Sequence, residues 1–425
     1  MLSKGLFIGG TTVLCFNFVR VFGLSISDWL FFATLVLVFS ETLFSNSVEA
    51  SFWYRNKFIG PAVLVFLGAT ISLVHSKSIP IAITELVQQI FVVTIFVSLI
   101  WILVQRGFSE AIVMALVISG FLASVVGVVD FISGSRIGPI ISATPEIQLW
   151  GRYAGPLGHP NKFGYFLVLS AILTMAQSFR PDSTLARRIL LGCALLVQVI
   201  GVFISGSVTA YLGFAFALLG MLIAFGTSRL FATLFWGVTQ FLAVIALIWV
   251  SWNMFQPPRN FAVGFDLPNL GGSAIQRVQG ITADSRLLLI KEAMRQIFPV
   301  PFIGAGYDQL STSGIGSFLR EIDGTVHNVF LQILYTGGIF AFVGWVAIHL
   351  QVGIYSISIL HKDKNRTTSY MVLGLAIAVL SMFVMDQFQD SIYHREKWLV
   401  IGLLVGHVWR MPKLNDAKSR LVLPA

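Results

Sequence analysis

Charged side chains are scarce in this chain of 425 residues, where Asp, Glu, Lys and Arg together make up 11% of the sequence. Soluble proteins carry about 25% charged residues, and the hydrophobic fraction here is 56%. So few charges could not cover the surface of a soluble protein of this size. The composition therefore excludes an ordinary soluble domain and predicts a polytopic membrane protein.

Cysteine is almost absent as well, and the two that occur, Cys15 and Cys193, both lie in apolar runs. This excludes a disulfide framework and a cysteine-based metal motif. The chain also lacks a Walker loop, an H-E-x-x-H motif and a G-x-S-x-G motif. We therefore expect no cofactor and no bound metal, so any reaction must use a substrate that arrives already activated.

A cleavable signal peptide is not expected, because the first apolar run has no A-x-A-like site and further spans follow it. The net charge of +9 does not indicate nucleic-acid binding. The basic residues gather in short loops between apolar runs, which is the orientation signal of a membrane protein.

The expected fold is an all-α polytopic membrane protein with about twelve transmembrane helices, each of about 20 residues. We expect the spans near residues 5–20, 28–45, 58–74, 82–104, 110–132, 163–179, 188–204, 208–225, 229–251, 328–350, 368–388 and 396–410. The chain then divides into helices one to nine (1–252), one large loop (253–326), and helices ten to twelve with a tail (327–425).

Four basic clusters fall on one side of such an arrangement, together with both termini. By the positive-inside rule that side is the cytoplasm, which places the large loop outside. The loop holds six basic and six acidic residues, as expected for a loop outside the cytoplasm. The clusters consist of Arg55 and Lys57; Arg180, Arg187 and Arg188; Lys362, Lys364 and Arg366; and Arg410, Lys413, Lys418 and Arg420.

The large loop contains a predicted amphipathic helix at 284–298, ended by prolines. Arg286 lies at the top of its apolar stripe, above Ile290, Ala293 and Ile297. A guanidinium in that place needs an anion, and its geometry suits phosphate. The alternative is an arginine that snorkels to lipid headgroups.

A second outer loop, at 133–161, carries Arg136 and Arg152, which could reach the same outer cavity as Arg286. Asn161 is predicted to cap the next helix, with His159 and Lys162 beside it. His159 is either a ligand of that cavity or a turn residue packed near the interface.

Two further groups stand at the outer ends of helices. His327 and Asn328 precede a long apolar helix, where a histidine can be a simple capping residue or a proton acceptor. Asp386, Asp390 and His394 are spaced by four, so they could share a helix face as a carboxylate–histidine relay. The other interpretation is a charge cluster that anchors the last span at the outer edge.

Several separated blocks together resemble the O-antigen ligase and polymerase family, including exopolysaccharide polymerases. They are GRYAGPLGHPNKFG at 151–164, SGSVTA at 205–210, the S-R-L and P-x-x-G-x-G of the large loop, and H-N-x-x-L followed by G-G-I. The first five spans match in hydropathy alone. One departure is Val208, at a position where the family often has a basic residue that contacts the pyrophosphate.

The resemblance implies a fold like the GT-C glycosyltransferases, placed in the bacterial cytoplasmic membrane with the active site facing the periplasm. It implies an undecaprenyl-pyrophosphate-linked glycan donor, a glycan or lipid-linked acceptor, and no metal. By position, Arg286 and His327 match the family's essential arginine and histidine. Arg152, Arg136, Asn328 and His159 would then contribute to substrate binding.

Three functions stay open at this point. A polymerase would join repeat units on the lipid carrier, and SGSVTA favours it; a ligase would move finished glycan onto lipid A-core. A transporter or flippase could use the outer arginines as an anion site. Transporters usually place polar residues in broken helices at the membrane midplane, whereas the middles of these spans are nearly free of charge.

Overall fold

The structure is a computed structural model. It describes residues 2–16, 20–21, 24–44, 59–133, 152–225, 302–306, 327–362 and 366–408. The large loop therefore lies outside the described residues except for 302–306, as do the predicted span at 229–251 and the predicted helix at 284–298.

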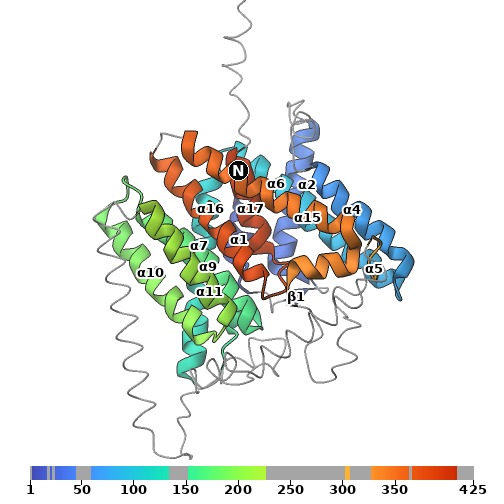
Figure 1. The fold of residues 1–425 in the computed structure, drawn as a ribbon. Helices are drawn as coiled ribbons and strands as arrows, with labels where there is room; N and C mark the ends of the chain where they lie inside the picture. The colour runs from blue at the N-terminus through green and yellow to red at the C-terminus, as the bar shows by residue number, and fades with distance from the viewer. Residues whose placement is uncertain are drawn as a thin grey trace, which may run out of the picture.

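Helices make up nearly all of the described chain (Figure 1). One two-stranded antiparallel hairpin, β1 (Arg20–Val21) with β2 (Leu24–Ser25), is the exception. The α-helices are α1 (Leu2–Thr12), α2 (Ile26–Phe44), α4 (Ile59–Ser72), α5 (Ile79–Ile90), α6 (Val97–Gln105), α7 (Ser109–Ile132), α9 (Pro160–Ser178), α10 (Leu185–Ile204), α11 (Val208–Phe225), α15 (Val329–Lys362), α16 (Arg366–Asp386) and α17 (Arg395–Val408). A π-helical turn, Phe91–Phe96, joins α5 to α6, and the 3₁₀ turns Leu73–His75 and Gly155–Leu157 follow α4 and precede α9.

Four helical segments of the described residues are long and apolar enough to cross a membrane: Ile79–Gln105, Ser109–Ile132, Leu185–Ile204 and Val329–Ile354. This confirms the prediction of a helical membrane protein, while the count of twelve spans and the GT-C-like fold stay predictions. The first helix is shorter than expected and ends at Thr12 instead of near residue 20. Its last four residues are two glycines and two threonines, which are weak helix formers.

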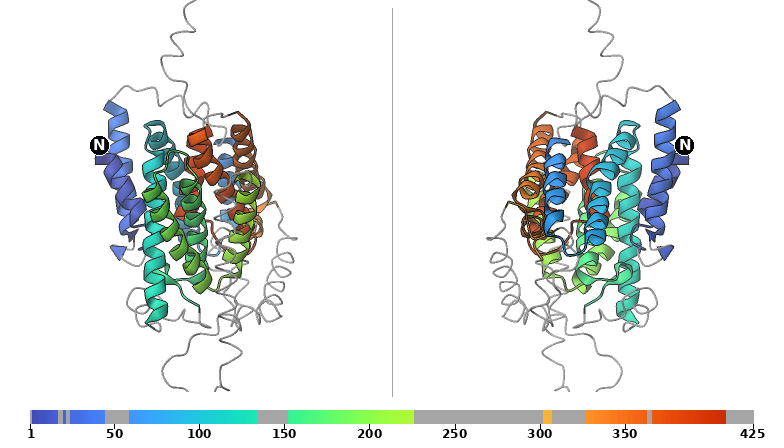
Figure 2. Two further views of the ribbon diagram at one scale, coloured as in Figure 1. Left: turned by 90° about the vertical axis from the view of Figure 1, so that its left-hand side faces the viewer. Right: turned by 90° about the vertical axis from the view of Figure 1, so that its right-hand side faces the viewer.

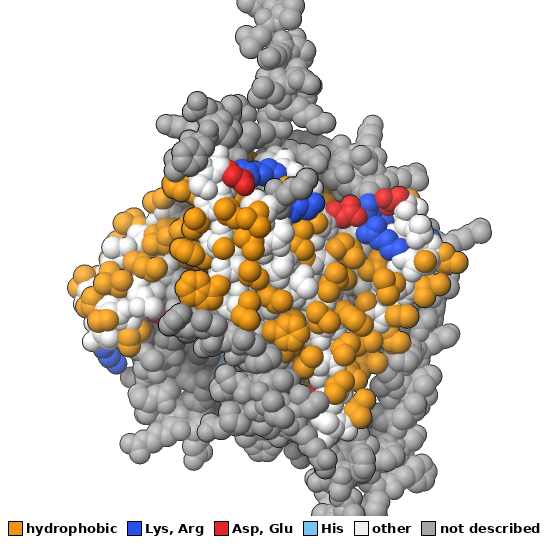
Figure 3. All heavy atoms as spheres, turned by 180° about the vertical axis from the view of Figure 1, so that it is seen from behind, with side chains coloured by type: hydrophobic (Ala, Val, Ile, Leu, Met, Phe, Trp, Pro, Cys, Tyr) orange, Lys and Arg blue, Asp and Glu red, His pale blue; other side chains and the backbone are white. Residues whose placement is uncertain are grey.

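Two helices form the centre of the bundle. All residues of α9 except Lys162 are buried, and α7, α10, α11 and α16 pack around it (Figures 1 and 2). In the other half of the bundle, α17 is buried from Glu396 to His407 and packs on α6, α15 and α16. The outer face seen in Figure 3 is broadly apolar, with most of the visible charged side chains along one edge. Such a surface suits contact with lipid acyl chains.

Glycines allow α4 and α15 to pack backbone against backbone. A Cβ atom on Gly68 would lie 2.4 Å from the Ala341 nitrogen, and one on Gly344 would lie 2.5 Å from the Pro61 oxygen. Small residues at helix interfaces replace the hydrophobic driving force that is missing within a membrane. The α4–α15 pair therefore depends on positions where no larger side chain fits.

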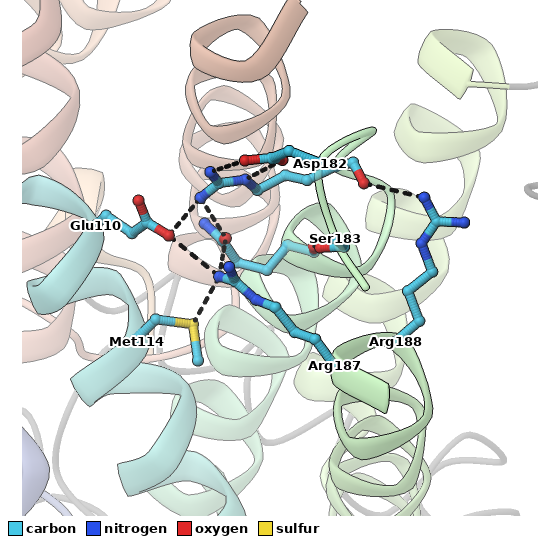
Figure 4. Close-up of polar contacts among 8 residues, drawn as sticks. Glu110, Met114, Asp182, Ser183, Arg187 and Arg188 are labelled. Carbon is cyan, nitrogen blue, oxygen red and sulfur yellow. Dashed lines mark hydrogen bonds and ion pairs between the residues drawn. The ribbon is translucent and has the colours of Figure 1, made fainter. Parts of the chain in front are cut away.

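A cluster of ion pairs closes one end of the bundle (Figure 4). Arg180, which is buried just after α9, binds Glu110 of α7 at 2.6 Å and Asp182 at 2.7 Å. Arg187 of α10 also reaches Glu110, at 3.2 Å, and Arg188 donates to the Arg180 carbonyl oxygen. These arginines form one of the predicted cytoplasmic clusters. The other end of α9 lies about 28 Å away, at 1.5 Å per residue over 19 residues.

We predict that Gly68→Ala lowers the thermal stability of the purified protein by about 1–3 kcal/mol, the usual cost of overpacking. The matched control is Gly60→Ala on the same helix, where a Cβ would meet no atom within 4 Å. Unfolding in detergent, followed by circular dichroism, measures both variants. Equal melting temperatures for the two would show that the close packing of α4 on α15 does not contribute to stability.

Candidate functional site

The end of the bundle opposite the arginine cluster of Figure 4 holds the described candidate residues. His159 is the N-cap of α9, and its Nδ1 accepts a hydrogen bond of 3.1 Å from the Asn161 backbone N–H. The sequence predicts Asn161 as the cap of this helix, and that prediction is wrong. The Asn161 side chain is instead occupied as an acceptor, by Arg152 and by the Ser207 hydroxyl at 3.1 Å.

Arg152 connects two of the sequence blocks that lie about fifty residues apart. Its Nη2 donates to Oδ1 of Asn161, and its Nε donates to the Ser205 carbonyl at 3.2 Å. Its aliphatic stem crosses Gly206, where a Cβ would lie 2.9 Å from the arginine Cγ and where φ is +57°. Glycine is therefore required at 206 both for the backbone conformation and for the passage of the arginine.

The SGS bend between α10 and α11 also lets α9 approach closely. A Cβ on Gly164 would lie 2.7 Å from the Ala210 Cβ and 2.8 Å from the Ser205 Oγ. The small residues of this block thus allow close helix approach, as their composition indicates. Val208 is the first residue of α11.

His327 and Asn328 differ in their contacts and backbone conformation at the start of α15. The Asn328 side chain caps the helix, since its Oδ1 accepts from the Leu331 N–H at 2.9 Å, and its Nδ2 donates to Oε1 of Gln387 at 3.1 Å. His327 has a φ of +52°, a left-handed conformation that is uncommon for residues other than glycine. Such conformations cost about 1–3 kcal/mol and cluster at functional sites.

Electrostatics indicate that these residues lie close to one another. Burial is the first cause that lowers the pKa of His159, to about 3, followed by the positive charges of its neighbours. In decreasing order these neighbours are Arg152, Lys162, His327 and His394. His159 is therefore neutral at physiological pH, and two cations and two further imidazoles lie close enough for their charges to act on it.

Of the predicted site residues, Arg152, His159, His327 and Asn328 are described, and all lie at this end of the bundle. Arg286 and Arg136 lie outside the described residues, so their place in the site stays a prediction. In the part of the chain that the structure describes, no three His, Cys, Asp or Glu side chains are grouped so that they could hold a metal ion.

The predicted shared face of Asp386, Asp390 and His394 is wrong. The helix α16 ends at Asp386, so the other two residues lie in the connection to α17. Asp390 accepts from the Ile392 N–H, while the carboxylate next to His394 is that of Glu396, with 3.2 Å between Oε1 and the imidazole Nδ1. The structure shows a cluster of charged side chains around the start of α17, and its outer placement stays a prediction.

Asp386 and Lys397 form the centre of that cluster, and both side chains are fully buried. The Lys397 Nζ lies 2.5 Å from Asp386 Oδ2 and 5.0 Å from the centre of the Trp345 ring. Asp386 Oδ1 accepts from the Tyr165 hydroxyl at 3.2 Å and from Ser391. Sequence reasoning did not predict that Lys397 is buried and pairs with Asp386, although a lysine next to the apolar run of α17 was the available signal.

Residues 302–306 are the described part of the large loop, and they lie on a break in α15. Gly338 has φ +68° and ψ −169°, which interrupts the helix. The Ala305 N–H donates to the Tyr335 carbonyl at 2.7 Å, and His75 Nδ1 lies 2.8 Å from the Gly304 carbonyl. The glycines of the P-x-x-G-x-G block therefore meet the G-G-I block here, and His75 in the 3₁₀ turn after α4 contacts the segment.

Residues 193–346 match the family model for O-antigen ligase. The matched region covers α10 from residue 193, α11, the large loop and the first half of α15, while Arg152 and His159 precede it and His394 follows it. No curated protein matches the sequence at a significant level.

We predict that Asp386→Asn destabilises the protein by about 3–5 kcal/mol, because it leaves the Lys397 ammonium buried without its counter-charge. The matched control is Glu41→Gln, which breaks the exposed pair with Arg106 and should cost at most about 1 kcal/mol. Thermal unfolding in detergent measures both. A loss no larger for Asp386→Asn than for Glu41→Gln would contradict a structural role for the buried pair.

Proposed function

We propose that this chain, of which residues 193–346 match the family model for O-antigen ligase, transfers a glycan from undecaprenyl pyrophosphate to an acceptor hydroxyl. The membrane is the bacterial inner membrane, and the site faces the periplasm. The observation that carries the proposal is the convergence of Arg152, Lys162 and three histidines at one end of a bundle whose opposite end holds the arginine cluster.

The donor needs a cationic site, since negative charge develops on the bridging oxygen as the pyrophosphate leaves. Positioned arginines in a water-poor cavity can stabilise that charge in the way that a metal does in other enzymes. Arg152 is held by hydrogen bonds to Asn161 and Ser205. Binding of the donor would therefore cost little further side-chain conformational entropy at this arginine. We assign Arg286 of the large loop to the same pyrophosphate, with Arg152 and Arg136 as its helpers.

The acceptor needs a base for its hydroxyl proton. The bond from the acceptor oxygen to the anomeric carbon forms as the bond from that carbon to the pyrophosphate oxygen breaks, and the proton passes to an imidazole. We assign this step to His327, which the left-handed backbone holds at the start of α15. His159 is less suited, because its Nδ1 is engaged by the Asn161 N–H and burial lowers its pKa.

Within this reaction class we propose a surface polysaccharide polymerase, which joins repeat units on the lipid carrier. The form of the SGSVTA block supports it. The second candidate is a ligase that attaches finished glycan to lipid A-core, and the description of the matching family favours that one. Both use the same donor chemistry and the same site.

Replacement of His327 by Ala, or of Arg286 by Ala, should abolish long-chain glycan in a deletion host that expresses the variant. Loss of a general base costs about 10²–10⁴-fold in rate, and loss of a donor-binding arginine should cost at least as much. The measurement is the ladder of glycan on a gel, at matched protein levels. Lys291→Ala is the control, because its predicted position on the solvated face predicts little loss.

A normal ladder from either variant would remove that residue from the mechanism. The products that accumulate in the deletion host separate the two candidates. Loss of a polymerase leaves single repeat units on the acceptor, whereas loss of a ligase leaves full chains on undecaprenyl pyrophosphate.

A further inference from the structure

The segment 302–306 belongs to the large loop and lies in the sequence between the two residues assigned to the reaction. Arg286 precedes it, and His327 follows it. The segment contacts α15 at the place where Gly338 breaks the helix, with φ +68° and ψ −169°. One point of the large loop is therefore held against the helix that begins just after His327.

Glycines on both sides make this contact possible. A Cβ atom on Gly304 would lie 2.5 Å from the Thr336 carbonyl oxygen, and one on Gly338 would lie 2.5 Å from the Phe302 carbonyl oxygen. Gly304 also has a φ of +86°, a conformation that favours glycine. The backbone N–H of Ala305 then donates a hydrogen bond of 2.7 Å to α15. The segment and the helix thus meet at positions where neither has room for a side chain.

A histidine from a distant part of the chain binds the same segment. His75 ends the 3₁₀ turn after α4, and its Nδ1 lies 2.8 Å from the Gly304 carbonyl oxygen. A carbonyl oxygen can only accept a hydrogen bond, so Nδ1 carries the hydrogen and donates it. His75 precedes the residues that match the family model, so the match does not point to it.

The helix that carries His75 is itself fixed on α15 close to the break. A Cβ atom on Gly68 of α4 would lie 2.4 Å from the Ala341 nitrogen and 2.7 Å from the Gly337 carbonyl oxygen. Backbones packed so closely leave α4 little freedom to shift along α15. His75 therefore reaches the segment from a helix whose position relative to the break is already set.

The imidazole of His75 is exposed, so it adds little to the packed interior of the bundle. One hydrogen bond from an exposed side chain also contributes little to the stability of a whole protein. The contact with Gly304 can nevertheless decide how firmly a short segment is held, because that segment has few other contacts to lose.

We propose that His75 is a positioning residue, which holds segment 302–306 on the break of α15 and thereby positions the large loop for the reaction. The second half of this inference rests on the proposed function, because the loop carries Arg286, the residue assigned to the pyrophosphate. His75 acts through the Gly304 carbonyl and does not contact the substrate in this role.

Hydrogen–deuterium exchange of the purified full chain in nanodiscs tests the contact directly, by mass spectrometry on peptides that contain 302–306. The Ala305 amide is protected from exchange while it donates to α15. His75→Leu removes the donor and should raise exchange by about 2- to 10-fold, as expected for the loss of one hydrogen bond. The control is Lys77→Ala, an exposed residue of the same connection, which should exchange as the wild-type protein does.

A conservative variant separates the hydrogen bond from other effects of the substitution. His75→Asn places its Nδ2 donor as many bonds from the backbone as the imidazole Nδ1, so protection of the Ala305 amide should return. The glycan ladder in the deletion host should follow the same order, with less long-chain product from His75→Leu and recovery in His75→Asn. The melting temperature of both variants in detergent should stay near that of the wild-type protein.

Gly304→Ala tests the same contact from the side of the segment. The added Cβ would press on the Thr336 carbonyl, so exchange at 302–306 should rise at least as much as in His75→Leu. The matched control is Gly107→Ala. Gly107 has a φ of +83°, close to that of Gly304, but a Cβ there meets no atom within 4 Å. The two variants together separate the close approach from the backbone conformation.

The outcomes separate the inference from the function on which it rests. Unchanged exchange in His75→Leu would overturn the inference, whatever reaction the protein performs. Raised exchange with a normal glycan ladder, or a large fall in melting temperature, would overturn the positioning role. If the wild-type protein does not restore glycan in the deletion host, the proposed function is wrong, and exchange still decides whether His75 holds the segment.

Discussion

The buried ion pair between Asp386 and Lys397 fixes the part of the bundle on which the site depends. An ammonium and a carboxylate removed from water are favourable only when their geometry is good and their remaining hydrogen-bonding capacity is met. Here Tyr165 and Ser391 bind the carboxylate, and the Trp345 and Trp398 rings lie within 6 Å of the ammonium. The pair therefore joins α16 to α17 and draws in α9 and α15.

The connection of eight residues between α16 and α17 is held at several points as a consequence. Asn328 and Thr209 bind its first half, and Tyr393 donates to the Glu85 carbonyl of α5. Arg395 then forms a two-pronged contact with Asp28 of α2. A short segment thus contacts helices from both halves of the bundle. Its polar contacts therefore set the relative positions of α9, α11 and α15 at the candidate site.

Sequence reasoning located most of the helices because apolar runs of about twenty residues bounded by charges have few alternatives in a membrane. It named the segment with Arg152 and the SGS block as two separate family-like blocks and did not predict that they are in contact. The actual bond, from the arginine to Asn161 and the Ser205 carbonyl, could not be foreseen because it depends on how α9 and α11 cross. The capping role of His159 was missed for a related reason: tertiary contacts occupied the asparagine that local preference favours as a cap.

The buried polar contacts around Asp386 were the least predictable feature. Spacing by four suggested a common helix face for Asp386 and His394, but α16 ends at the first of them. Side chains from other parts of the chain, such as Tyr165 and Lys397, decide where this helix ends. The periodicity of the apolar residues does not predict those contacts. In contrast, Gly206 and its small neighbours could be recognised as a place of close approach, because few other features explain small residues at the end of a span.

The break of α15 at Gly338 has a consequence for protein engineering. The amide of Ala305 donates to the Tyr335 carbonyl, three residues before the break, so the 302–306 segment and α15 are joined through their backbones. Backbone polar groups within an apolar layer have to be satisfied by the protein itself, because no water is available there. A chimera that received the 302–306 segment of another protein without the matching α15 would not reproduce this hydrogen bond, so the two segments have to be transplanted as one unit.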